Sequence, residues 1–194
     1  MSPQGILLAA GYGRRFDPDG QQDKLLAPLA DGRPVLWHSA RALADALPGS
    51  LAVIRPGQPE RARWLHEAGC RMLEAPAAEA GMGHALAAAV AASAEADGWV
   101  VALADMPWLP AAAICAVAAH LTTPSTIAAP RHHGQRGHPV GFGKAWREQL
   151  MALAGDHGAR AILATTTVNL FDWDDAGVLR DVDTRNDLVE RGTI

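Results

Sequence analysis

A short stretch near the N-terminus combines the residue types that bind phosphate. An apolar run at 4–9 is followed by Ala-Gly-Tyr-Gly-Arg-Arg at 10–15, and Lys24 stands at the start of a second apolar run. Small residues leave main-chain N–H groups accessible, while arginine and lysine supply positive charge for phosphate oxygens. The stretch therefore predicts a loop that holds a polyanionic phosphate chain. A strand-to-helix turn with basic residues on its surface is the structural alternative.

The loop differs from two common phosphate-binding motifs. The fingerprint GxGxxG would need a third glycine at position 16, where this chain has Phe16, and no GxxxxGK[ST] sequence occurs. A hydride-transferring dinucleotide enzyme would also place an acidic residue at the end of its second strand. This chain has Arg55 there, so a dinucleotide enzyme is the weakest of the alternatives.

An aspartate follows the most apolar predicted strand. Asp105 comes directly after the segment GWVVAL at 98–103 and a single alanine. Ligands of open α/β sheets bind at the carboxyl ends of the strands, and Mg²⁺ needs only one or two carboxylates beside substrate phosphates. Asp105 is therefore a candidate magnesium ligand. Its alternative role is to cap the helix that begins near Pro110.

Two glycine-rich segments suggest contacts with the rest of a substrate. Gly81-Met82-Gly83 opens a predicted helix, and its glycines would let a flat nucleobase approach the backbone. Arg136 and His138 lie between glycines in the segment 134–142 and could bind a second, anionic substrate. A solvated hairpin with a chance basic cluster is the alternative for the latter segment.

The elements that would position these residues alternate along the chain. Strand-length runs at 4–9, 51–55, 70–74, 98–103, 126–130 and 168–172 alternate with helical segments at 34–47, 58–68, 83–96, 110–120, 145–154, 159–163 and 185–191. Such alternation predicts an α/β fold, with a mostly parallel twisted sheet and helices on both faces. We expect one domain over 1–194, with a substrate-facing excursion of loop or hairpin around 131–143.

Composition restricts the class of protein. The net charge is -4 and the isoelectric point is about 6.0, whereas a general nucleic-acid binder normally carries a basic stripe. Cys70 and Cys115 match no metal or redox spacing and predict reduced thiols. The N-terminus does not read as a signal peptide, and the most apolar window, 85–94, is too short to span a bilayer. We expect a cytoplasmic protein without nucleic-acid or membrane partners.

The motifs resemble those of the MobA-like nucleotidyltransferase family, whose fold is Rossmann-like. The chain's LLAAGYGRRF, DKLLAPL and GRPVLWHSARAL resemble the family's opening, LAAGxSxRMG…KLL…PVL. Phe16-Asp17 replaces the usual Met-Gly, and the segment before Lys24 is longer than in the family. The resemblance implies that Arg15, rather than Arg14, holds the triphosphate and that Lys24 contacts the phosphates at the reacting centre. The implied nucleotide-binding residues are Leu8, Ala9, Ala10, Gly11, Gly13, Arg15, Lys24, Gly81 and Met82.

The same resemblance implies a metal site and an acceptor site. LADMP around Asp105 resembles the family's metal-binding signature, and DVDTRNDL resembles its C-terminal DIDTPEDL. Asp105 would bind Mg²⁺, with Asp183 as a second candidate, although Asp183 or Thr184 could instead cap the last helix. RGHPVGF and the GDHGAR at 155–160 resemble the cytidylyltransferase branch of the family. They imply contacts with a pterin phosphate by Arg136, Gly137, His138, Pro139 and Arg160.

The implied reaction is the Mg²⁺-dependent transfer of CMP from CTP to the phosphate of molybdenum-molybdopterin, with release of pyrophosphate, during molybdenum cofactor maturation. Arg15, Lys24 and Asp105 would be its catalytic residues, and a molybdoenzyme or its maturation chaperone would be the protein partner. Besides the hydride-transferring enzyme, three alternatives remain. These are transfer to a sugar or alcohol phosphate, guanylyl transfer from GTP to molybdopterin, and a non-enzymatic nucleotide-binding regulator or cofactor chaperone.

Overall fold

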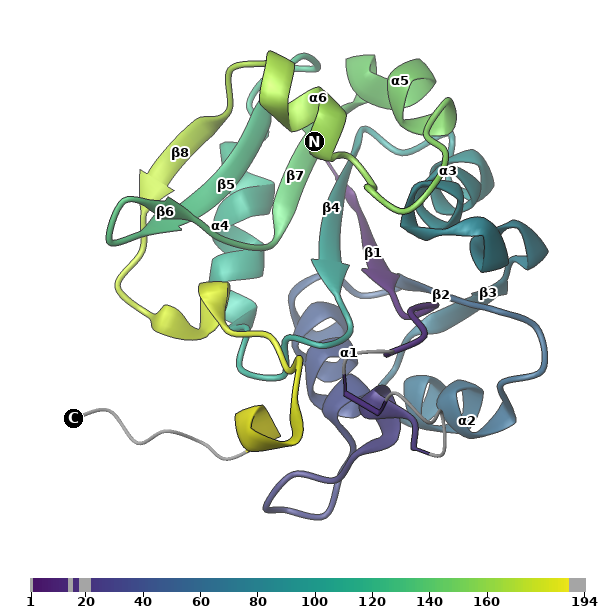
Figure 1. Cartoon of the computed structure of the whole chain (residues 1–194). Helices are drawn as coiled ribbons and strands as arrows, with labels where there is room; N and C mark the ends of the chain where they lie inside the picture. The colour runs from purple at the N-terminus through teal and green to yellow at the C-terminus, as the bar shows by residue number, and fades with distance from the viewer. Residues whose placement is uncertain (1, 14–15, 18–21, 189–194) are drawn as a thin grey trace.

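A computed structural model describes residues 2–13, 16–17 and 22–188, and within them the strands form one eight-stranded sheet. The order is β3-β2-β1-β4-β7-β5-β6, with β8 paired to β5. Figure 1 shows β3 and β8 towards opposite edges of the molecule. The strands are β1 (Gln4–Leu8), β2 (Leu51–Ile54), β3 (Arg71–Glu74), β4 (Gly98–Leu103), β5 (Ile127–His132), β6 (Gln135–Arg136), β7 (Val140–Gly143) and β8 (Asn169–Asp172).

Most of the strands run in one direction. β1 pairs in parallel with β2 and β4, β2 with β3, and β5 with β8. β7 is antiparallel to both β4 and β5, and β6 is antiparallel to β5. The prediction of a mostly parallel sheet is confirmed.

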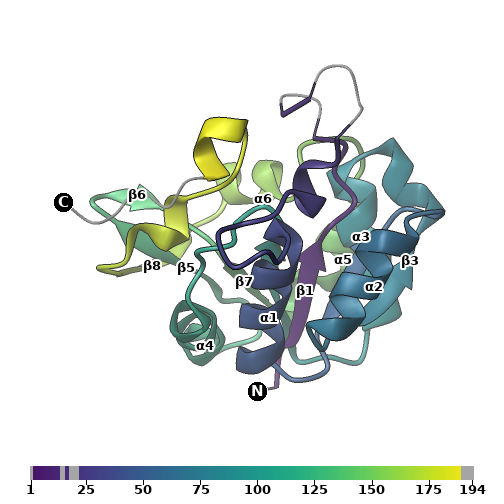
Figure 2. The same cartoon turned by 90° about the horizontal axis from the view of Figure 1, so that it is seen from below.

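Two apolar clusters show that helices cover both faces of the sheet. One cluster contains Leu36, Leu65 and Ile114, which come from α1 (Val35–Ala46), α2 (Pro59–Glu67) and α4 (Ala111–His120). The other contains Leu86 and Leu150, from α3 (Met82–Ala92) and α5 (Arg147–Met151), and packs against α6 (Arg160–Thr165). In Figure 2, α1 and α4 lie to the left of β1 and α3 lies to its right.

The strand order reverses between β1 and β4. The chain leaves β1 through α1 to reach β2 on one side, and returns from β3 through α3 to β4 on the other side of β1. Ile6 and Leu8 of β1 join one apolar cluster while Leu7 joins the other, because successive side chains point to opposite faces. A reversal of this kind leaves a crevice outside the carboxyl ends of the two strands, where open α/β sheets bind ligands.

The excursion expected at 131–143 contains a core strand as well as a hairpin. β5 and β6 form a hairpin, but β7 is wholly buried between β4 and β5. A Cβ on Gly141 would lie 2.7 Å from the Val117 side chain, and one on Gly143 would lie 2.3 Å from the Pro124 carbonyl oxygen. Glycine has low strand propensity, so sequence reasoning interpreted this glycine-rich segment as a loop or hairpin. The same glycines allow the close packing of β7.

The remaining predicted elements appear with shifted bounds. The helix expected at 145–154 divides into η3 (Lys144–Trp146) and the short α5, and the C-terminal helix is a 3-10 turn, η5 (Arg185–Leu188). The last residues predicted for that helix, 189–191, lie outside the described residues. No helix in the described part of the chain is both long and apolar enough to cross a membrane.

Candidate active site

A cavity of about 200 Å³ lies at the carboxyl ends of β1 and β4, where the strand order reverses. It is open to solvent and receives residues from five separate stretches of the chain. Its described lining consists of Leu8, Ala10, Gly11, Tyr12, Gly13, Lys24, Leu25, Ala78, Gly81, Met82, Ala85, Leu103, Asp105 and Asp156. Most of the residues predicted to bind nucleotide therefore surround one space, which is the crevice that the topology defines.

The predicted phosphate loop begins where β1 ends. Gly13 has a φ of +65° and would bring a Cβ within 3.0 Å of the Cβ of Lys24, so a larger residue is disfavoured there. Its carbonyl oxygen accepts hydrogen bonds from the amides of Phe16 and Asp17 at 2.9 and 3.3 Å. Arg15, the predicted triphosphate ligand, lies outside the described residues, and its role stays a prediction.

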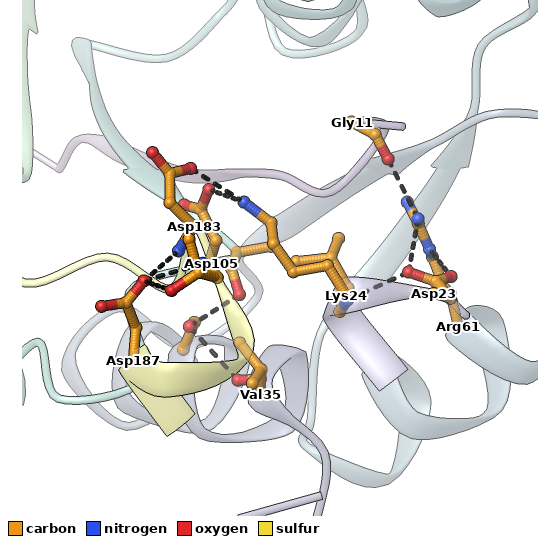
Figure 3. A network of polar contacts seen from close by, with 12 residues as sticks. Gly11, Asp23, Lys24, Val35, Arg61, Asp105, Asp183 and Asp187 are labelled. Carbon is orange, nitrogen blue, oxygen red and sulfur yellow. Dashed lines mark hydrogen bonds and ion pairs between the residues drawn. The ribbon is translucent and has the colours of Figure 1, made fainter. Parts of the chain in front are cut away.

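Arg61 of α2 ties both ends of this loop together. Its guanidinium donates to the carbonyl oxygens of Ala9 at 2.5 Å and Gly11 at 3.0 Å. It also binds the Asp23 carboxylate through two hydrogen bonds of 2.6 and 2.8 Å, as Figure 3 shows. The Arg61 side chain is only 3% exposed, so this charge is satisfied inside the protein.

Sequence reasoning placed Arg61 within the helix predicted at 58–68 and gave it no role. The available signal was weak. Arg61 lies on the same face of α2 as the buried Leu65, four positions later, and so points towards the core.

Lys24 points from the loop's far end into a group of carboxylates (Figure 3). It begins η1 (Lys24–Leu26), whose N-terminus is capped by the Asp23 carboxylate through a 2.9 Å hydrogen bond from the Leu25 amide. The Lys24 Nζ atom donates to Asp105 Oδ2 at 2.7 Å and lies 3.6 Å from Asp183 Oδ1. The two predicted catalytic side chains, Lys24 and Asp105, are therefore in direct contact.

Three carboxylates could hold a divalent cation beside Lys24. Oxygens of Asp105, Asp181 and Asp183 lie within 4.8 Å of one another. Burial and the negative charges of Asp105 and Asp183 raise the pKa of Asp181. Lys24 supplies one positive charge against three carboxylates, so the group has an excess of negative charge that favours a hard cation.

The segment 181–187 reaches the site because its backbone is fastened there. The Val182 amide donates to the Asp105 carbonyl oxygen at 2.8 Å, and Asp181 and Asp183 lie on either side of this bond. The Asp187 carboxylate accepts from the amides of Asp183 and Thr184 at 3.2 and 2.7 Å. Asp187 thus makes the turn contacts at the start of η5, while the Asp183 carboxylate faces Lys24. The sequence reasoning named Asp183 but missed Asp181.

The N-terminus of α3 forms another wall of the cavity. Gly81 has a φ of +129°, and a Cβ there would lie 2.5 Å from Asp156 Oδ1. The Gly83 amide donates to the Gly155 carbonyl oxygen at 2.7 Å, and the Gly155 amide donates to the His84 ring at 3.1 Å. The glycines of this segment thus allow a loop from beyond α5 to pack against α3.

The predicted acceptor residues lie outside the described lining of the cavity. Arg136 is exposed on β6, and Arg160 is exposed at the start of α6. Gly137 packs against Val178, where a Cβ would lie 2.6 Å from the carbonyl oxygen, and Pro139 is buried after a cis peptide bond with His138.

His138 lies near the acidic group and is half-buried. Its amide donates to the Val178 carbonyl oxygen at 2.8 Å, and its buried Nδ1 atom has no hydrogen-bond partner within the described structure. Burial lowers the pKa of His138 to about 4, the charge of Asp105 opposes the shift, and Arg136 adds to it. The ring is therefore neutral at pH 7.

A glycine-rich loop, a buried lysine and a carboxylate cluster at this edge of the sheet form a site suited to holding a nucleoside triphosphate and a divalent cation. This combination defines the class of nucleotide-handling α/β proteins. Residues 5–170 match the family model described as the MobA-like NTP transferase domain. The chain belongs to this nucleotidyltransferase family.

Solved structures share the fold. Rv0371c from Mycobacterium tuberculosis H37Rv is 23% identical, with a TM-score of 0.78 and 96% of each chain covered. A manganese complex of Rv0371c is 24% identical, with a TM-score of 0.73 and the same coverage. A nucleotidyl transferase from Methanothermobacter, Mth528, is 20% identical, with a TM-score of 0.80 and 96% and 94% covered.

A more distant structure with the same fold was solved with a nucleotide. The CMP:2-keto-3-deoxy-manno-octonic acid synthetase complexed with CTP is 12% identical, with a TM-score of 0.72, and 96% of this chain and 95% of that one are covered. A search of curated proteins returned no match.

Proposed function

We propose that the protein transfers CMP from CTP to the terminal phosphate of molybdenum-molybdopterin and releases pyrophosphate. One observation carries the proposal: the 2.7 Å contact between Lys24 Nζ and Asp105 Oδ2 in the cavity that the glycine-rich loop lines. The contact brings a phosphate-neutralising cation and a metal-binding carboxylate to one point. Family membership and the order of the sequence motifs support the reaction class.

In the proposed reaction, an oxygen of the acceptor phosphate attacks the α-phosphorus of CTP in line. A new P–O bond forms, the bond between the α-phosphorus and its bridging oxygen to the β-phosphate breaks, and pyrophosphate leaves. The attacking oxygen is already anionic, so no covalent enzyme intermediate or general base is required. The protein's contribution is positioning and charge neutralisation.

Each part of the site has a role in this scheme. The amides of Gly11 to Gly13, together with Arg15, hold the β- and γ-phosphates, and Lys24 neutralises charge at the α-phosphorus. Gly81 and Met82 border the base. Arg136 and His138 belong to the elements proposed to receive the pterin phosphate, because a guanidinium binds an anion and a neutral imidazole can still donate one N–H hydrogen bond to it.

The carboxylates of Asp105, Asp181 and Asp183 fit a hard divalent cation, and we propose Mg²⁺ held by Asp105 and Asp183. When bound, Mg²⁺ would supply Lewis-acid charge to the phosphate oxygens. The manganese complex of Rv0371c supports a divalent cation in this fold, and the CTP complex of the 12% identical synthetase supports a cytidine nucleotide.

A panel of substrates tests the proposal. Pyrophosphate release is measured with CTP, GTP and UTP, each combined with molybdenum-charged molybdopterin, a sugar phosphate and an alcohol phosphate. We expect release with CTP and the pterin, and mass spectrometry should show a pterin extended by CMP. Release only with a sugar or alcohol phosphate would refute the pterin assignment, while CTP binding that is independent of Mg²⁺ and gives no turnover would favour a regulator.

A further inference from the structure

Asp156 brings a third charged side chain to the nucleotide cavity. Of the described residues that line the cavity, those with charged side chains are Lys24, Asp105 and Asp156. Lys24 and Asp105 pair with each other at 2.7 Å. Within the described structure, the Asp156 carboxylate has no hydrogen-bond or ion-pair partner. It is therefore an acceptor available to a ligand.

The position of this carboxylate is set by the close packing of its loop against α3. Asp156 Oδ1 and the Gly155 carbonyl oxygen each lie 2.5 Å from the place where a Cβ of Gly81 would be. Two hydrogen bonds hold the Gly155 backbone: its carbonyl oxygen accepts from the Gly83 amide, and its amide donates to the His84 ring. A Cβ on Gly83 would lie 2.6 Å from the Ala154 carbonyl oxygen, so the loop packs closely against α3. Movement of the loop would break its hydrogen bonds to Gly83 and His84.

The surroundings of Asp156 suit a nucleobase better than a phosphate. The lining residues Ala78, Met82 and Ala85 are apolar, and Met82 is 42% exposed. An apolar wall can cover the flat face of a base, whereas a carboxylate repels phosphate oxygens. A carboxylate accepts hydrogen bonds but cannot donate them, and it recognises the exocyclic N4 amine of cytosine in other proteins.

We propose that Asp156 selects the nucleobase by accepting a hydrogen bond from the N4 amine of cytosine. Uracil presents a carbonyl oxygen at the same place, which leaves the carboxylate unpaired and facing another acceptor. The inference rests on the proposed nucleotidyl transfer and assigns its base specificity. It gives the GDHGAR segment a role on the nucleotide side, in addition to the acceptor role expected for Arg160.

The test compares CTP with UTP, which differ at that one position of the base. Binding is measured by titration calorimetry with Mg²⁺, and kcat/KM is measured from pyrophosphate release. We expect the wild-type protein to favour CTP by at least about tenfold, the usual worth of a hydrogen bond to a charged group. Asp156→Asn should reduce this preference by about tenfold or more, because an amide can also donate to the uracil oxygen. Glu79→Gln, which removes a carboxylate from the neighbouring η2 (Pro76–Ala80), should leave the preference unchanged.

Each outcome has a distinct meaning. An Asp156→Asn protein that turns over with an unchanged CTP to UTP ratio would overturn the inference, as would a change in acceptor KM alone. If Asp156→Asn weakened the binding of GTP and left the binding of CTP unchanged, the cytosine assignment would be overturned. Asp156→Ala, with thermal unfolding as a folding check, should lower CTP binding and should not lower UTP binding, because the variant loses both the hydrogen bond to cytosine and the repulsion of the uracil oxygen. A wild-type protein that binds CTP but transfers it to no acceptor would overturn the proposed function and leave the base selection standing.

Discussion

The clamp formed by Arg61 and Asp23 should control both stability and nucleotide binding. Replacing Arg61 by Met removes four hydrogen bonds, two to Asp23 and two to the carbonyl oxygens of Ala9 and Gly11, and leaves the Asp23 charge unpaired. Breaking a buried ion pair on one side typically costs about 3–5 kcal/mol. The loss should appear as a lower free energy of unfolding in urea and as a higher Kd for CTP.

Two comparisons separate the clamp from a general effect of charge. Arg63→Met removes an exposed arginine from the same helix, whose partner Glu60 lies 3.4 Å away, and should cost less than about 1 kcal/mol. Adding Asp23→Asn to Arg61→Met removes the stranded charge but keeps the oxygen that caps η1. The double variant should therefore recover part of the stability without recovering CTP affinity.

The reasoning fails if Arg61→Met unfolds within about 1 kcal/mol of the wild-type protein and binds CTP with unchanged affinity. That result would mean that the contacts between α2 and the loop are incidental to the shape of the phosphate site. A loss of stability without any change in Kd would also refute the positioning role.

Three further predictions concern the site and its supports. Lys24→Ala should lower kcat by about 10²–10³-fold, whereas Lys144→Ala, at the exposed η3, should not affect it. Between pH 6.5 and 4 the unfolded chain binds a proton at His138 that the folded chain excludes, so the free energy of unfolding should fall by up to about 3 kcal/mol. Gly83→Ala should destabilise the protein by about 1–3 kcal/mol in urea, because its Cβ would meet the Ala154 oxygen.

These predictions have direct counter-results. Equal losses in the two lysine variants would remove the special role of Lys24. A His138→Gln protein whose stability falls with pH as steeply as that of the wild type would show that another group titrates. An unchanged urea midpoint for the glycine variant would show that the loop at 154–156 can move aside.

The alternating pattern of the sequence predicted the mostly parallel sheet and both helical layers, and it pointed to a candidate site at the carboxyl edge of the sheet. The strands Gln4–Leu8 and Gly98–Leu103 are mostly apolar, and the residues that follow them meet at the carboxyl edge by topology alone. The sequence alone therefore indicates that Lys24 and Asp105 lie at one edge of the sheet.

Other features depend on contacts between distant segments, which residue types do not specify. Arg61 reads as a surface residue until Ala9, Gly11 and Asp23 surround it. Asp156 joins the cavity only because glycines in α3 allow its loop to approach. In β7, glycines serve packing against α4, and the same composition made the strand resemble a loop.

Magnesium-dependent pyrophosphate release from CTP, compared between the wild-type protein and Asp105→Asn, tests the central claim most directly. Asp174→Asn, an exposed carboxylate outside the acidic group, is the matched control. With molybdenum-charged molybdopterin as acceptor, turnover should fall by about 10²–10³-fold in Asp105→Asn and remain normal in the control. Near-normal release by a folded Asp105→Asn protein would contradict the assignment of Lys24 and the carboxylates to the reacting centre.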